Sequence, residues 1–168
     1  MGRVFGPPDE ALTAYGVEVA ETRRSRTIAA EAQAIWDVLA DFGAVSSWAD
    51  IAEHSCLLSP AAQAVGVGTA RRVQMGRDTF VERITDFDPP ISLSYDVEGL
   101  PRLVRQLRST WSLRPLARGY TEVTLTNSVD IGSNPVQKLG ERIFGRISIK
   151  QLDLLLAGLA NEVEGAHV

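Results

Sequence analysis

The chain has few of the residues that build disulfides and metal centres. It contains one cysteine, Cys56, and two histidines, His54 and His167. A single cysteine excludes an internal disulfide and a cysteine-rich zinc cluster. Two histidines also disfavour a structural zinc site. We therefore expect no metal and no cofactor, and we expect His167 to belong to a C-terminal tail.

Long hydrophobic runs and an excess of positive charge are also missing. No apolar run reaches the roughly 20 residues of a transmembrane helix, and the first residues, MGRVFGPPDEAL, hold no apolar segment of the kind that signal peptides need. These absences predict a cytoplasmic protein. The net charge is −4 and the isoelectric point is about 5.2, which disfavours nucleic acid as a partner.

What remains is the composition of an ordinary globular domain. The chain has 168 residues, of which 45% are hydrophobic and 23% charged, enough for one domain with a sizeable core. Residues 1–16 are rich in glycine and proline and predict an N-terminal arm. We place the domain at residues 17–165.

The hydrophobic pattern changes period twice along this domain. After a first strand, helical spacing covers two short segments, period-two alternation follows, and a long helix of about 28 residues begins at Asn134-Pro135, where Asn is a good cap and Pro a good first residue. The pattern predicts an α+β fold with about seven antiparallel strands. The expected strands are 17–28, 53–58, 68–75, 78–87, 91–98, 104–114 and 120–131, and the expected short helices are 31–40 and 42–49.

The hairpin around Gly76 predicts a specific charge pair. A glycine at the first central position suits a two-residue type II′ turn, which pairs Met75 with Asp78. Counting back along both strands pairs Arg71 with Glu82, on the face that should point inward. The pair is either a structural cross-strand ion pair or the polar anchor of a ligand cavity.

Other polar residues share the inward phase of the later strands. We expect a cavity of at least about 300 Å³, the lower end for ligand sites. An ordinary filled core is the alternative. The candidate ligand-binding residues are Trp48, His54, Arg71, Glu82, Tyr95, Arg105, Trp111 and Asn127.

Three other patterns give weaker signals. His54 and Cys56 lie two apart on one strand face, too far for a nucleophile pair, and are expected to line the cavity or pack in the core. Gly66-Val67-Gly68 lacks the lysine and helix of a phosphate loop and predicts a plain turn. Glu82 and Asp86 share a face in this pattern but have no further metal ligand nearby.

Several motifs occur along the chain in a characteristic order and spacing. They are Ile35-Trp36 with Leu39-Ala40-Asp41-Phe42 and Trp48, Gly66 to Val73, Glu82-Arg83-Ile84 with Asp86 to Pro90, Leu93-Ser94-Tyr95, and Trp111 to Pro115. Together they resemble the START-like helix-grip superfamily, and more closely its polyketide cyclase/dehydrase and lipid transport branch. The resemblance covers about residues 17–165 and implies a curved antiparallel sheet wrapped around a long C-terminal helix.

Fold alone does not fix a function, and three remain open. The favoured one is binding or transport of a hydrophobic lipid-, sterol- or polyketide-like molecule. The second is an aromatase/cyclase acting on a poly-keto chain, for which Arg71, Glu82 and Tyr95 are the candidate catalytic residues. The third is a regulatory domain with a vestigial cavity. The sequence leaves the oligomeric state open, a dimer included.

Overall fold

The computed structural model describes residues 19–60, 62–102, 104–131 and 135–165, except for the side chains of 135–148. The expected arm at 1–16, the expected cap Asn134 and His167 lie outside these residues. The elements follow the expected order, and the strand bounds differ from the predicted ones by at most two residues at the ends. They are β1 (Val19–Ile28), α1 (Ala32–Ala40), η1 (Phe42–Ser47), β2 (His54–Leu57), β3 (Ala70–Met75), β4 (Asp78–Asp88), β5 (Ser92–Glu98), β6 (Gln106–Pro115), β7 (Thr121–Asp130) and α2 (Pro135–Gly165).

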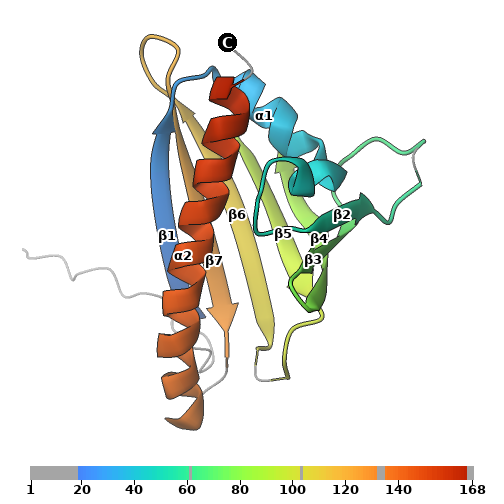
Figure 1. Ribbon diagram of the computed structural model, residues 1–168, viewed down its shortest axis with the longest axis vertical. Coiled ribbons are helices and arrows are strands. Elements are labelled where there is room, and N and C mark those ends of the chain that lie inside the picture. Colours follow the sequence, from blue (N-terminus) through green and yellow to red (C-terminus); the bar gives the residue numbers. More distant parts are fainter. Residues whose placement is uncertain (1–18, 61, 103, 132–134, 166–168) are drawn as a thin grey trace, which may run out of the picture.

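The seven strands form one antiparallel sheet in the order β1-β7-β6-β5-β4-β3-β2. The sheet curves around α2, as Figure 1 shows. Helix α2 packs along β1 and β7, while α1 and η1 lie over the other half of the same face. This arrangement is the helix-grip fold that the sequence predicts.

Alternating burial fixes which side chains point toward α2. Along β7, every second residue from Thr121 to Val129 is buried and the residues between them are partly exposed. Helix α2 contributes Leu152, Leu156 and Leu159 to the same core. Burying such side chains is the main favourable contribution to folding, and it holds the helix on the sheet.

The β3–β4 hairpin has the predicted register. Met75 pairs with Asp78, and Arg71 pairs with Glu82. Gly76 has φ of +60°, a value that favours glycine and that a type II′ turn requires at this position. The turn therefore places Arg71 and Glu82 on the inward face.

The second short helix is present as the 3-10 helix η1, which ends at Ser47 rather than at residue 49. Two other expectations about local structure are wrong. A β-bulge lies between Ile84 and Asp86; the extra residue reverses the phase, so that Asp86 is exposed and does not share the face of Glu82. The sequence pattern predicts that Arg105 points inward with the residues of β6. It lies before the strand begins, and its side chain is exposed.

Helix α2 also bears on the question of a membrane span. Among the described residues, no helix is both long and apolar enough to cross a bilayer. The cytoplasmic location expected from the sequence stays a prediction.

Candidate functional site

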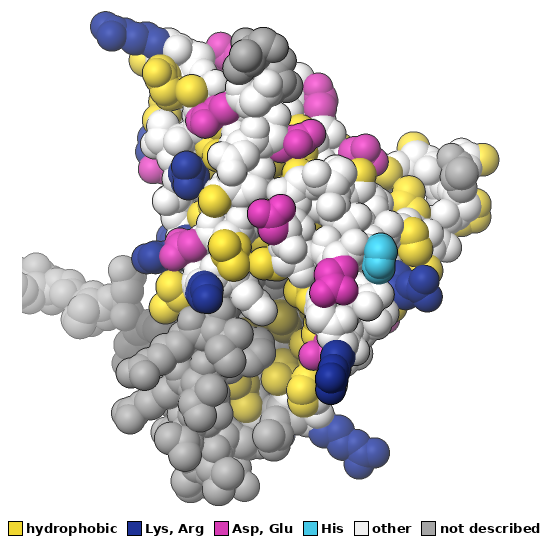
Figure 2. All heavy atoms as spheres, viewed as in Figure 1, with side chains coloured by type: hydrophobic (Ala, Val, Ile, Leu, Met, Phe, Trp, Pro, Cys, Tyr) yellow, Lys and Arg dark blue, Asp and Glu magenta, His cyan; other side chains and the backbone are white. Residues whose placement is uncertain are grey.

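A cavity of about 140 Å³ lies between α2 and the concave face of the sheet. In Figure 2, hydrophobic side chains gather in a hollow beside the helix. The cavity is smaller than the 300 Å³ expected from the sequence, because large aromatic side chains fill part of the space between sheet and helix. The residues that line it are Ile51, Met75, Phe80, Glu82, Tyr95, Val97, Leu100, Leu107, Ser109, Asn127, Gln151, Leu152 and Leu155.

The polar lining residues of the sheet are neighbours across its strands. Tyr95 on β5 pairs with Ser109 on β6, which pairs with Asn127 on β7. The Ser109 hydroxyl donates a hydrogen bond to Asn127 Oδ1 at 2.8 Å, and both residues are buried. A mainly apolar cavity with a few fixed polar groups is typical of a small-molecule site.

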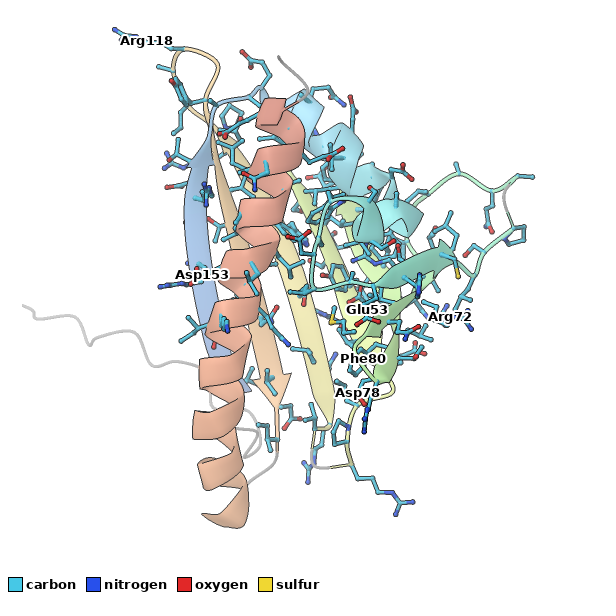
Figure 3. The ribbon with its side chains drawn as sticks, in the orientation of Figure 1. Glu53, Arg72, Asp78, Phe80, Arg118 and Asp153 are labelled. Atoms are coloured by element: carbon cyan, nitrogen blue, oxygen red, sulfur yellow. The ribbon has the colours of Figure 1, made fainter. Side chains whose placement is uncertain are left out.

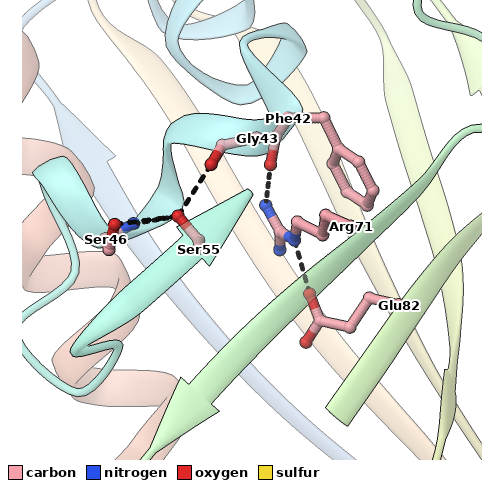
Figure 4. A network of polar contacts seen from close by, with 6 residues as sticks. All are labelled: Phe42, Gly43, Ser46, Ser55, Arg71 and Glu82. Atoms are coloured by element: carbon pink, nitrogen blue, oxygen red, sulfur yellow. Dashed lines mark hydrogen bonds and ion pairs between the residues drawn. The ribbon is translucent and has the colours of Figure 1, made fainter. Parts of the chain in front are cut away.

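Glu82 on β4 pairs with Val97 rather than with Tyr95 and so lies diagonal to this polar row. It adds a charged group to the cavity lining. Arg71 Nε donates to Glu82 Oε2 at 2.6 Å, and each side chain is only 7% exposed. Figure 4 shows this pair beneath η1. A buried ion pair persists only where each charge is balanced and hydrogen-bonded, so the two residues act as one unit.

Aromatic rings enclose the charge of Arg71. The guanidinium carbon lies 4.0 Å from the centroid of the Phe42 ring and 5.2 Å from that of Tyr95, both within the range of a cation–π contact. Its Nη1 atom also donates to the Phe42 carbonyl oxygen at 2.8 Å. Arg71 is therefore held behind the cavity wall, and it does not line the cavity.

The same surroundings perturb Tyr95. Burial raises the pKa of Tyr95 to about 12, and the negative charge of Glu82 adds to the increase. The charge of Arg71 and hydrogen bonds involving Trp111 and Ser109 oppose it. The phenol is therefore protonated at neutral pH and keeps its hydrogen-bond donor.

A serine that the sequence analysis missed holds η1 on the sheet. Ser55 of β2 points inward; its hydroxyl accepts a hydrogen bond from the Ser46 amide at 3.0 Å and donates to the Gly43 carbonyl oxygen at 2.7 Å (Figure 4). Arg71 binds the preceding carbonyl, that of Phe42. Side chains of two strands thus satisfy backbone groups of η1 that helical hydrogen bonds leave open.

The structure separates the eight candidate ligand-binding residues into three groups. Glu82, Tyr95 and Asn127 line the cavity. Arg71, Trp48 and Trp111 are buried outside its lining, with the two indole rings in edge contact at 6.2 Å. His54 and Arg105 are exposed and do not line it.

His54 points outward because Ser55 takes the inward position of β2, opposite Val73. Cys56 is exposed on the same outer face, so the expectation that these two residues line the cavity or pack in the core is wrong. Both border a polar hollow of about 350 Å³ with Arg72, Gln74 and Thr79. In Figure 3, Arg72 lies on the outer side of the sheet edge formed by β2 and β3. Its lining is more polar than apolar, so it is a poorer site for a hydrophobic ligand than the cavity.

Several lining residues were not singled out from the sequence as ligand-binding. Phe80, Val97 and Leu107 lie in the inward phase that the alternation predicts, so the sequence carried a signal for them. Ile51 and Gln151 come from the loop after η1 and from α2, and only the folded chain brings them to the strands. In the described part of the chain, no cluster of three or more His, Cys, Asp or Glu residues could hold a metal ion.

Comparison of the chain with known protein families identifies the family to which it belongs. Residues 19–164 match the family described as polyketide cyclase/dehydrase and lipid transport. The chain belongs to this family. A search of curated proteins finds no match. The polyketide cyclase/dehydrase and lipid transport family is the one that the sequence motifs indicate.

Solved structures share the fold at low sequence identity. The ZhuI aromatase/cyclase from Streptomyces sp. R1128 is 18% identical, with a TM-score of 0.72, over 88% of this chain and 94% of its own. A START superfamily protein from Mycobacterium smegmatis is 16% identical, with a TM-score of 0.71, over 87% and 98%. Ara h 8.0201 is 12% identical, with a TM-score of 0.67, over 88% and 99%. At these identities the likeness shows the fold of this family member and no particular activity.

Proposed function

We propose that the protein binds a small, mainly hydrophobic molecule in the cavity between α2 and the sheet. The observation that supports this is the lining, in which apolar side chains such as Phe80, Val97 and Leu155 surround a short polar row. Burial of an apolar ligand against such a wall is favourable, and the polar groups would set its orientation.

The placement of Arg71 supports binding over catalysis on a poly-keto chain. A cationic group that stabilises an enolate must reach the reacting oxygen. Arg71 instead donates hydrogen bonds to Glu82 and to the Phe42 carbonyl oxygen, and it packs against two aromatic rings. Tyr95 lines the cavity and stays protonated, so it is the candidate that the cyclase alternative would have to use as a donor.

A fluorescent apolar probe tests the proposal. We expect 2-methoxynaphthalene to bind saturably, with one site per chain. Val97→Phe places a larger side chain in the cavity and should weaken this binding at least about tenfold, because the probe and the ring compete for one space. Val67→Phe is the matched control, since Val67 is 70% exposed. Absence of saturable binding, or equal binding to both variants, would contradict the proposal and favour a regulatory domain with a vestigial cavity.

A further inference from the structure

The carboxylate of Glu82 presents an unused hydrogen-bond acceptor to the cavity. The side chain is 7% exposed and lines the cavity, and Arg71 occupies only its Oε2 atom. Within the described part of the chain, no hydrogen bond reaches Oε1. Figure 4 shows this second oxygen turned away from Arg71.

An acceptor in this position favours one kind of ligand group. An ionised carboxylate can only accept hydrogen bonds. Glu82 lines the cavity, and its Oε1 atom is not among the fully enclosed, unpartnered polar atoms of the described residues, so a ligand in the cavity can reach it. A ligand that brings a donor to Oε1 gains a hydrogen bond there, whereas a ligand with only acceptors, or with a negative charge, is repelled.

The net charge of the Arg71–Glu82 pair further restricts the class of ligand. Arg71 already balances the negative charge of Glu82 at 2.6 Å, so the pair is neutral as a unit. A cationic ligand would bring an uncompensated charge into a mainly apolar space, which is costly. A neutral donor adds no charge and still forms a charge-assisted hydrogen bond.

We propose that the cavity selects hydrophobic molecules that carry a neutral hydroxyl group, which donates its hydrogen to Glu82 Oε1. The apolar part of the ligand lies against Phe80 and Val97 on the sheet and Leu155 on α2. This inference rests on the proposed binding function and specifies its ligand class.

Two matched probes test this selectivity in the full-length protein. 2-Naphthol and 2-methoxynaphthalene have the same ring system, but only the first can donate a hydrogen bond. We expect 2-naphthol to bind about tenfold more tightly at neutral pH, in fluorescence titrations. Equal affinities would overturn the selectivity and leave the binding function standing. No saturable binding of either probe would overturn both.

A double variant tests the assignment to Glu82. Arg71→Met/Glu82→Leu removes both charges together. This variant should bind 2-naphthol and 2-methoxynaphthalene with about equal affinity. The control is Arg83→Met/Glu98→Leu, which removes an exposed cross-strand ion pair between diagonal neighbours on the outer face, with 3.0 Å between Arg83 Nε and Glu98 Oε1. It should keep the preference.

A single variant covers the case in which the double variant does not fold. Glu82→Gln keeps the shape of the side chain but replaces a charged acceptor by a neutral one, so the preference should fall several-fold. Circular dichroism identifies the folded variants. An unchanged preference in either folded variant would overturn the role of Glu82.

Discussion

Gly158 of α2 lies directly against the backbone of Trp48, and a Cβ atom at position 158 would overlap the Trp48 carbonyl oxygen. The backbone at Trp48 has little freedom to move away, since Trp48 and the adjacent Ala49 are both buried. This contact sets how closely the helix approaches the segment after η1.

Gly158→Ala should therefore destabilise the protein. An overlap with a backbone atom should cost about 3 kcal/mol or more, at the upper end for overpacking, which outweighs the gain of ~1 kcal/mol that alanine gives inside a helix. Urea unfolding measures the difference. Gly165→Ala, at the end of the same helix, has open space around the added atom and should not destabilise; equal effects of the two substitutions would contradict the contact.

The Arg71–Glu82 pair should show strong coupling in a double-mutant cycle. Arg71→Met and Glu82→Leu should each cost about 3–5 kcal/mol, because each leaves the partner charge buried and unbalanced. The double variant should cost less than either single variant. For the exposed Arg83–Glu98 pair the same cycle should give less than ~1 kcal/mol. Additive effects at Arg71 and Glu82, read from urea unfolding, would show that the two charges act independently.

Tyr95 should make stability depend on pH in the alkaline range. Its pKa is raised from 10.0 to about 12 in the folded state, so the unfolded chain loses this proton first. The contribution is fully present below pH 10 and is lost as pH rises from 10 to 12, by about 2–3 kcal/mol.

Urea unfolding at pH 8 and pH 11 can test this. Tyr95→Phe should lose less stability between the two values than the wild type does. Tyr120 is 46% exposed, and Tyr120→Phe should lose as much as the wild type. A Tyr95→Phe variant with the wild-type pH dependence would contradict the assignment.

Ser55→Ala should loosen η1 without unfolding the sheet. The substitution removes the acceptor of the Ser46 amide and the donor to Gly43, at a cost of about 1–2 kcal/mol. Hydrogen exchange of the Ser46 amide should accelerate, while amides of β6 and β7 keep their protection. Cys56→Ala, at the exposed neighbouring position, should leave both unchanged.

The sequence was sufficient where local rules decide the outcome. Gly76 fixes the turn, the turn fixes the register, and period-two alternation then brings Arg71 and Glu82 together on the inward face. The same logic correctly placed Tyr95 and Asn127 on that face. No long-range information is needed for any of these steps.

The sequence was insufficient where a local irregularity or a contact between distant residues determines the direction of a side chain or the size of the cavity. The bulge after Ile84 reverses the phase of Asp86, and nothing in the alternation marks it. The sequence predicts His54 and not Ser55 at the inward position of β2, because a four-residue strand carries too little pattern to fix its phase. The size of the cavity depends on how Trp48, Trp111 and α2 fill the space together, which only three-dimensional packing determines.

The strand order has a consequence for how the chain reaches this structure. From β2 to β7, each strand pairs with the next one along the chain, but β1 pairs with β7, about a hundred residues away. Closing so long a loop is slow compared with forming hairpins. We expect the meander to assemble first and β1 to dock last, so that pulsed hydrogen exchange would find β4–β6 amides protected before those of β1. Before β1 docks, we expect the positive charges of Arg23, Arg24 and Arg26 to disfavour its pairing with strands of other chains.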